Sequence, residues 1–385
     1  MYSDSNNKVL NFILEKGDVT GILHWRFHIM NNKKSNSIVC MLLLLGVCLY
    51  FRFIYLNLST NRYDKSAARV SFNKTKYTSL TPKQNSCKET FNRTLEDNLN
   101  VIQNYPVGNA SKYLLRLGIY RVIPNQLRKF PVFVTAFDSS HYNESQGFFK
   151  CLHENFLYNP KYKGDVLIVV YDMGLTELQR KTVQKYCKCE MRTLQFERYP
   201  THVRTLSTYA FKPIIIQESL MDFGFVWWID TSIRFMTTDI DSQIEYAKTH
   251  SFFYVVSRNF LAKTGLTKNT LNATFDFLHE DHCKFRPFHE IWGGVILFHF
   301  DRISRAIAQA WVTCALNELC IAPKGSENKR ACDEKQNYDG RCHRFDQSAI
   351  SIITRRLFHN SDYPIDINLT LILKTKRDEN VQYFI

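Results

Sequence analysis

The sequence lacks the glycine-rich motifs with which many α/β proteins bind phosphate or build a nucleophile. Its 14 glycines form neither GxGxxG nor the GxxxxGKS/T pattern of a P-loop. These absences argue against a dinucleotide-binding or P-loop protein. GxSxG is also missing, which argues against the nucleophile elbow of an α/β-hydrolase. The chain contains no internal repeat and no low-complexity tract, so a repeat architecture is not expected.

The composition of the chain is that of a globular protein. Its 385 residues are 45% hydrophobic and 14% aromatic, which is enough to bury a large core and argues against global disorder. The net charge of +14 favours anionic ligands or surfaces, although lysine and arginine also simply solvate an ordinary surface. Charge alone therefore does not decide the function.

One segment near the N-terminus is long and apolar enough to cross a membrane. It runs from Ile38 to Leu58 and contains a single charge, Arg52, near one end. A buried core helix or a cleaved signal peptide are the alternatives, but 37 residues come first and bulky residues fill the exit side. We therefore predict a cytosolic tail at 1–37, a signal anchor at 38–58, a lumenal stem at 59–125 and an α/β domain at 126–385.

The positions of the glycosylation sequons favour a lumenal location for everything after the anchor. All Asn-x-Ser/Thr sequons lie at or beyond its end, and the first, Asn57, is too close to the membrane for modification. We expect the others to be glycosylated: Asn73, Asn92, Asn109, Asn143, Asn272 and Asn368. This predicts a single-pass type II membrane protein of the Golgi or another secretory compartment, and excludes a nucleic-acid partner.

Cysteine usage agrees with an oxidising compartment. Nine cysteines follow the anchor, so at least one is free or pairs between chains. Cys187 and Cys189 have only one residue between them, and no second pair stands at zinc spacing. We expect each of them to form a structural disulfide with a different partner.

From about Phe130 onwards, apolar strands and helical segments alternate. Predicted strands are 131–138, 165–172, 191–197, 225–230, 252–257 and 293–300; predicted helices are 144–157, 176–187, 207–223, 239–250, 301–319 and 346–358. This rhythm predicts a doubly wound α/β sheet, which binds ligands beyond the carboxyl ends of its strands. Asp138, Asp172 and Asp230 all stand at such ends, although Asp172 could serve only to hold its turn.

Three segments carry a resemblance to glycosyltransferases of the A-type fold in the Golgi. An apolar strand runs into Asp230 in VWWIDTS, where that group has the Asp-x-Asp motif that meets a nucleotide sugar and its divalent ion. WGGVILF (292–298) resembles the later strand that shapes the donor and acceptor pocket, and DQSA (346–349) the Asp-Gln pair opening a late helix. The strings VYDMGL, FKPIII, WWIDTSIRF and HRFDQSA resemble an uncharacterised family expanded in nematodes, itself similar to glycosyltransferases.

The resemblance implies a nucleotide-diphospho-sugar transferase-like domain over about 130–370 and a Mn²⁺ or Mg²⁺ cofactor. Asp230 would be the first metal and donor ligand, but Ser232 replaces the second acid, which puts the cation in doubt. A literal Asp-x-Asp exists at Asp239 and Asp241. It lies at an expected helix start, where acids ordinarily complement the helix dipole.

Further candidates follow from what a departing diphosphate and an acceptor hydroxyl require. Arg204 and Lys212 could hold the diphosphate or belong to a solvated helix face. Gly293 and Gly294 are expected to shape the donor site. Asp346 or Glu290 could be the base for the acceptor hydroxyl. The alternative for Asp346 is a role as helix N-cap, and the alternative for Glu290 is an ordinary surface acid.

Two functions follow. The first is transfer of a sugar from a nucleoside-diphosphate donor to a lumenal glycan or glycoprotein. The second, favoured by Ser232, is a catalytically degenerate glycosyltransferase-like membrane protein that binds glycans or partner proteins.

Overall fold

The computed structural model describes residues 87–122, 127–255, 265–359, 372–377, 379 and 381–385, all within one compact unit, Lys83–Ile385. The predicted tail, the anchor at 38–58, Asn57, Asn73 and Asn368 lie outside the described residues. Within the described part, every helix is too short or too polar to span a bilayer.

A six-stranded sheet forms the centre of the domain, with the order β3-β2-β1-β4-β7-β6. The first four strands in sequence run parallel: β1 (Val132–Phe137), β2 (Ile168–Asp172), β3 (Glu190–Thr193) and β4 (Phe225–Ile229). The predicted α/β layout is confirmed, but the sheet is mixed. β7 (Val295–His299) lies between β4 and β6 (Phe252–Tyr254) and runs antiparallel to both.

Several helices begin or end at a residue that local sequence signals predict. Thr176 and Gln179 form a capping box at the start of α5, and Asp301 caps α9. Pro213 is the third residue of α6, where its missing N–H costs no hydrogen bond, and Gly224 ends that helix with a positive φ of 68°. The bounds are α4 Tyr142–Leu152, α5 Glu177–Tyr186, α6 Phe211–Phe223, α7 Asp241–His250, α8 Asn272–Phe277, α9 Arg302–Ala315, α10 Glu318–Ile321 and α11 Asp346–Leu357.

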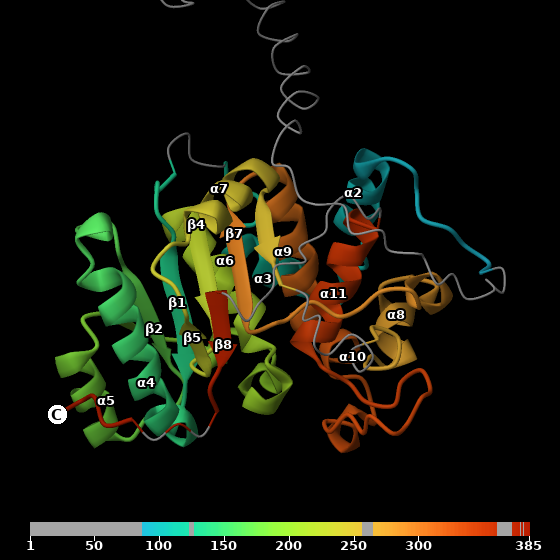
Figure 1. Cartoon of the computed structure of the whole chain (residues 1–385). Coiled ribbons are helices and arrows are strands. Elements are labelled where there is room, and N and C mark those ends of the chain that lie inside the picture. The colour runs from blue at the N-terminus through green and yellow to red at the C-terminus, as the bar shows by residue number, and fades with distance from the viewer. Residues whose placement is uncertain (1–86, 123–126, 256–264, 360–371, 378, 380) are drawn as a thin grey trace, which may run out of the picture. The chain divides into compact units, whose positions relative to one another are not determined.

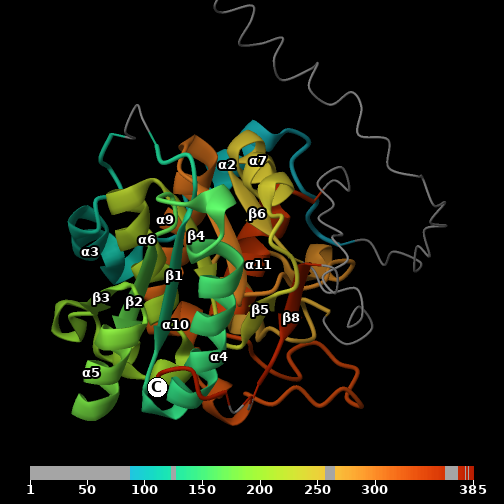
Figure 2. The same cartoon turned by 60° about the vertical axis from the view of Figure 1, so that its left-hand side comes forward.

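Helices cover both faces of the sheet (Figure 1, Figure 2). α6 and α9 lie on one face, and α4 lies on the other together with a two-stranded sheet of β5 (Ile233–Phe235) and β8 (Leu373–Thr375). Aromatic side chains fill the layer between: Trp227 packs 5.8 Å from Phe133 and 5.3 Å from Phe235, measured between ring centroids. β4 is buried along its whole length, which fixes the position of the residue that follows it.

The described part of the predicted stem belongs to the folded domain. α2 (Leu95–Gln103) buries Leu99 and Ile102 and packs against α9 and α11, and α3 (Ser111–Arg116) packs against α9. A disulfide joins Cys87 to Cys283. The domain therefore begins well before residue 126. Composition did not reveal this, because α2 places few apolar residues on one face of an otherwise polar segment.

The cysteine pairing corrects one prediction and confirms another. Cys187 and Cys189 bond to each other instead of to different partners, since the chain turns sharply between α5 and β3. The remaining described pairs are Cys314–Cys320 and Cys332–Cys342, and Cys151 is free, as the odd number required. The four described sequon asparagines, at 92, 109, 143 and 272, are all exposed.

Candidate functional site

The candidate site lies at the carboxyl edge of the parallel strands, where four segments meet. Asp230 directly follows β4, and its N–H donates to the carbonyl of Gly294 at 2.9 Å. The N–H of Ile233 donates to the carbonyl of Asp230 at 3.0 Å, so the chain turns immediately after the strand. The start of α6 contributes Lys212 and the start of α11 contributes Asp346.

Lys212 joins these segments through its ammonium group. Its Nζ lies 3.2 Å from Oδ1 of Asp230 and 3.0 Å from Oδ2 of Asp346, and it donates a hydrogen bond to the carbonyl of Gly293 at 3.0 Å. An ammonium has three N–H donors, so these three oxygens use all of them. The ring of Trp228 lies 5.4 Å away, and its indole N–H donates to Oδ1 of Asp230 at 2.8 Å.

Burial and charge pull the protonation of this cluster in opposite directions. Burial lowers the pKa of Lys212, but Asp230 and Asp346 outweigh it and hold the pKa above the usual value, so the group stays charged. Burial raises the pKa of Asp346, and Lys212 opposes that rise. The Lys212 side chain is only 4% exposed and its donors are in use. It is therefore neither on a solvated helix face nor a free phosphate ligand in this arrangement.

The two glycines leave room for the two carboxylates. A Cβ atom at Gly294 would lie 2.8 Å from Oδ2 of Asp230, and one at Gly293 would lie 3.2 Å from Oδ2 of Asp346. Any side chain at Gly294 would thus displace the Asp230 carboxylate. The indole nitrogen of the half-buried Trp292 lies 3.4 Å from the same Cβ position, so this ring borders the cluster.

Asp346 takes part in the cluster instead of capping its helix. The N-cap position of α11 is Phe345, which has a φ of 49°, and Asp346 is the first helical residue. Its backbone carbonyl accepts from the indole N–H of Trp311 at 3.0 Å. The next residue, Gln347, accepts from the N–H of Gly293 at 3.2 Å and ties α11 to the loop before β7.

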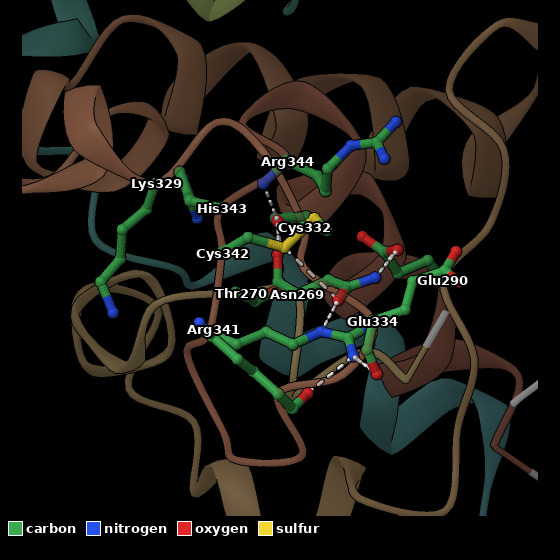
Figure 3. The surroundings of a disulfide bond; sticks show 12 residues. Asn269, Thr270, Glu290, Lys329, Cys332, Glu334, Arg341, Cys342, His343 and Arg344 are labelled. Carbon is green, nitrogen blue, oxygen red and sulfur yellow. Dashed lines mark hydrogen bonds between the residues drawn. A yellow bond between two sulfur atoms is a disulfide. The ribbon is translucent and has the colours of Figure 1, made fainter. Parts of the chain in front are cut away.

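Glu290 lies in a neighbouring buried network (Figure 3). Oε2 of Glu290 accepts from Nδ2 of Asn269 at 2.7 Å, and Oδ1 of Asn269 accepts from Nε of Arg341 at 2.9 Å, next to the Cys332–Cys342 disulfide. Burial raises the pKa of Glu290 to about 7. The residue is 3% exposed, so the alternative of a plain surface acid was wrong. Glu290 thus holds the Asn269 side chain in place. Of the two proposed bases, only Asp346 lies in the cluster with Asp230 and Lys212.

The structure does not bring Arg204 into the cluster. Arg204 is exposed and its guanidinium lies over the ring of Phe196, 5.8 Å from the centroid. Ser232 is buried in the turn after Asp230, and its carbonyl accepts from the N–H of Lys376 at 2.7 Å. The sequence did not indicate Lys376, because β8 is distant in sequence from Ser232 and no residue pattern around Lys376 predicts that the two pair.

Three acids outside the cluster, Asp172, Asp239 and Asp241, are used in turns and ion pairs. One carboxylate oxygen of Asp172 accepts from the N–H groups of Gly174 and Leu175, each at 2.8 Å, and the other pairs with Arg180 at 2.6 Å. Its suggested role in fixing the turn is confirmed. The exposed Asp239 and Asp241 stand at the start of α7 and both pair with Lys161, as expected of acids at a helix start.

The residues at this site do not fit the divalent cation that the resemblance implies. The Lys212 ammonium occupies the space between the two carboxylates, and serine stands where a second acid would. Mg²⁺ and Mn²⁺ prefer carboxylate oxygens at close range in near-octahedral geometry. Within the described ranges, no group of three or more His, Cys, Asp or Glu side chains is arranged to hold a metal ion.

A cavity of about 460 Å³ exists elsewhere, between α3, α6 and the β2–β3 side of the sheet. Some of its polar groups pair with one another, while Arg116, Arg121 and Arg198 line it as exposed side chains. Arg192 pairs with Glu190 and Asp222, while Glu218 accepts from the hydroxyls of Tyr171 and Tyr199. We therefore favour the cluster at Asp230 as the functional site, because its groups converge from separate segments at the ligand-binding edge of the sheet.

Comparison with protein families matches residues 71–217 to a family described as "Protein of unknown function (DUF1647)". The matched span includes Lys212 but ends before Asp230. No curated protein matches the chain.

Similar solved structures are glycosyltransferases, all at low identity. The bifunctional glycosyltransferase WbbM in its apo form is 10% identical, with a TM-score of 0.37 over 62% of this chain and 38% of its own. An active-site mutant of LgtC is 13% identical, with a TM-score of 0.33 over 59% of this chain and 70% of its own. Mouse xyloside xylosyltransferase 1 is 12% identical, with a TM-score of 0.31 over 58% of this chain and 81% of its own. The chain thus spans well under half the length of WbbM.

Proposed function

We propose that this protein is a glycosyltransferase that moves a sugar from a nucleoside-diphosphate donor to a lumenal glycan or glycoprotein. One observation carries the proposal: Asp230, Lys212, Asp346, Gly293 and Gly294 come together at the carboxyl edge of the parallel strands. The segments VWWIDTS, WGGVILF and DQSA, which resemble donor-handling segments of A-type glycosyltransferases, are the ones that meet there.

The arrangement suits the binding of sugar or ribose hydroxyls. The Asp230 side chain is 35% exposed, and Lys212 and the Trp228 indole hold its Oδ1 in place. A hydroxyl of the donor can then donate to Oδ2. During transfer the bond between the anomeric carbon and the diphosphate oxygen breaks, and the acceptor oxygen bonds to that carbon. A base takes the proton of the acceptor hydroxyl, and the Asp346 carboxylate is the candidate for this base in the cluster.

The compartment is part of the proposal. A single-pass type II protein with its α/β domain in the Golgi or another secretory compartment would meet both nucleotide sugars and glycan acceptors. The predicted anchor at 38–58 and the exposed asparagines of four sequons support this location. A shift in electrophoretic mobility on glycosidase treatment would test it.

A panel of nucleotide sugars tests the activity. The full chain is incubated with each donor, and donor hydrolysis and transfer to glycan acceptors are measured. Asp230→Ala should abolish both, while the exposed Asp239→Ala, from the literal Asp-x-Asp, should leave them unchanged. Full activity of a folded Asp230→Ala variant would refute the site.

A catalytically degenerate protein that binds glycans or partner proteins is the second candidate. Two observations favour it: Ser232 replaces an acid, and Asp346 is only 5% exposed and already paired with Lys212. The same panel separates the two functions, because absence of donor binding with and without Mn²⁺ would support the degenerate protein.

A further inference from the structure

The net charge of the cluster of Asp230, Lys212 and Asp346 is negative when both acids are ionised, so the cluster alone does not favour an anionic ligand. Asp230 and Asp346 face a single buried cation, Lys212, which leaves an excess of negative charge when both acids are ionised. A bound diphosphate would add more. The site therefore needs a further positive charge, from a metal ion or from another side chain.

Lys212 stands in the way of a metal ion. Its Nζ lies within 3.2 Å of Oδ1 of Asp230, Oδ2 of Asp346 and the carbonyl of Gly293. These are the oxygens that could otherwise converge on a cation, and the ammonium takes their place at the centre. Removing Lys212 would leave three hard oxygen ligands around one vacated space, which is the ligand type that Mn²⁺ prefers.

Lys376 lies opposite Ser232 in the β5–β8 pair. β5 and β8 pair antiparallel with Ile233 opposite Thr375 and Arg234 opposite Lys374, and the N–H of Lys376 donates to the carbonyl of Ser232. Ser232 and Lys376 are thus directly opposite, and opposite residues of an antiparallel pair project from the same face. An acid at position 232 would neutralise this lysine, whereas serine leaves its charge available.

The contacts of Lys376 agree with such a role. The residue is half-buried, and no acidic side chain pairs with it in the part of the chain that the structure describes. Arg234, on the same face of this pair, is instead used internally: it pairs with Glu379 at 2.9 Å and donates to the carbonyl of Thr231 at 2.6 Å. Lys376 is therefore the cation of this pair whose backbone adjoins the turn after Asp230.

We propose that the Asp230 site binds a nucleoside diphosphate without a divalent cation: Lys212 fills the space between Asp230 and Asp346, and the ammonium of Lys376 contacts the diphosphate. This inference rests on the proposed function and specifies how the donor's charge is met. It also accounts for Ser232, because an acid there would compete with the diphosphate for Lys376.

Calorimetric titration of the full chain with UDP and GDP, in EDTA and in Mn²⁺, provides the first test. We expect equal affinity in both buffers. Lys376→Ala should weaken binding by at least about tenfold, since a charged contact is lost. Lys374→Ala is the matched control, because Lys374 lies on the same strand and face but opposite Arg234; its affinity should stay within about twofold of wild type.

The outcomes separate the two proposals. Binding that requires Mn²⁺, or equal losses in Lys376→Ala and Lys374→Ala, would overturn the lysine-based site and leave the proposed function standing. Absence of binding in both buffers would overturn both.

Mn²⁺ binding without nucleotide, followed by electron paramagnetic resonance, provides a second test that does not depend on activity. The wild-type chain should bind no Mn²⁺ at this site, and Lys212→Ala should gain a weak Mn²⁺ site that Asp346→Asn removes. Mn²⁺ bound by the wild-type chain and lost in Asp230→Asn would overturn the inference.

Discussion

The buried Glu290 predicts a dependence of stability on pH that one substitution removes. Burial raises the pKa of its carboxyl from an ordinary 4.5 to about 7. In the unfolded chain the carboxyl ionises with its ordinary pKa of 4.5, so its ionisation favours the unfolded state as the pH rises above that value. The stabilisation that the protonated Glu290 carboxyl contributes is therefore complete below pH 4.5 and is lost as the pH rises to about 7. At 1.36 kcal/mol per pH unit, the loss amounts to about 3 kcal/mol.

Glu290→Gln keeps the shape of the side chain but cannot ionise. Denaturant unfolding of both proteins, followed by tryptophan fluorescence at several pH values, gives the difference in free energy of unfolding. We expect this difference to change by about 3 kcal/mol between pH 4.5 and pH 7.5 in favour of the variant. The comparison must be a difference, because other buried groups also titrate. Burial lowers the pKa of His343 to about 4, so its contribution is lost as the pH falls below 6.5.

A pH-independent difference between wild type and Glu290→Gln would refute the reasoning. It would mean that the carboxyl is not desolvated in the folded protein. The exposed Glu318→Gln serves as the control for the loss of one carboxyl outside the core, and it should not reproduce the change expected for Glu290→Gln.

Three further substitutions test the architecture around the site. Gly294→Ala should weaken UDP or GDP binding at least about tenfold with an unchanged circular dichroism spectrum, because its Cβ displaces Asp230; unchanged affinity would show that this carboxylate has room to move. Glu280→Ala should cost about 3–5 kcal/mol of unfolding free energy, since it leaves Arg356 as a buried cation without its carboxylate, whereas Lys284 keeps its ion pair with Glu89; a loss below about 1 kcal/mol would contradict the burial of the Arg356 charge. Replacing Cys87 and Cys283 together by serine should cost about 2–5 kcal/mol, because their disulfide closes a loop of 196 residues; denaturation of the oxidised proteins checks this, and no loss would indicate that the segment before α2 is not tied to the domain.

Local sequence patterns predicted most helices and strands, for reasons that act over a few residues. The apolar run before Asp230 became the fully buried β4, the Thr176–Gln179 capping box opened α5, and Gly224 ended α6. Such signals depend on side-chain periodicity and on local hydrogen bonds, both of which can be read from neighbouring letters.

The placement of Asp230 at the working edge of the sheet was also predictable. A carboxylate after a buried parallel strand must emerge at the carboxyl edge, so the sequence alone determined the strand, its end and the acid that follows. The resemblance nominated Gly293, Gly294 and Asp346, and the charge of a departing diphosphate nominated Lys212; Lys212 and Asp346 each had an alternative role.

Only the tertiary structure decided how these residues relate. It placed β7 antiparallel beside β4, docked α2 against the domain, and paired Cys187 with Cys189. These outcomes depend on contacts between segments distant in sequence, and no local pattern records them.

The roles of the lysines show this most clearly. The sequence marked Lys212 as a cation near the site, but only packing buries its ammonium between two aspartates, and only the register of β5 and β8 sets Lys376 opposite Ser232. The sequence thus determined which charged groups are available along the chain. The fold determined which charges neutralise one another, because that depends on distances of a few ångströms between residues that the chain itself keeps far apart.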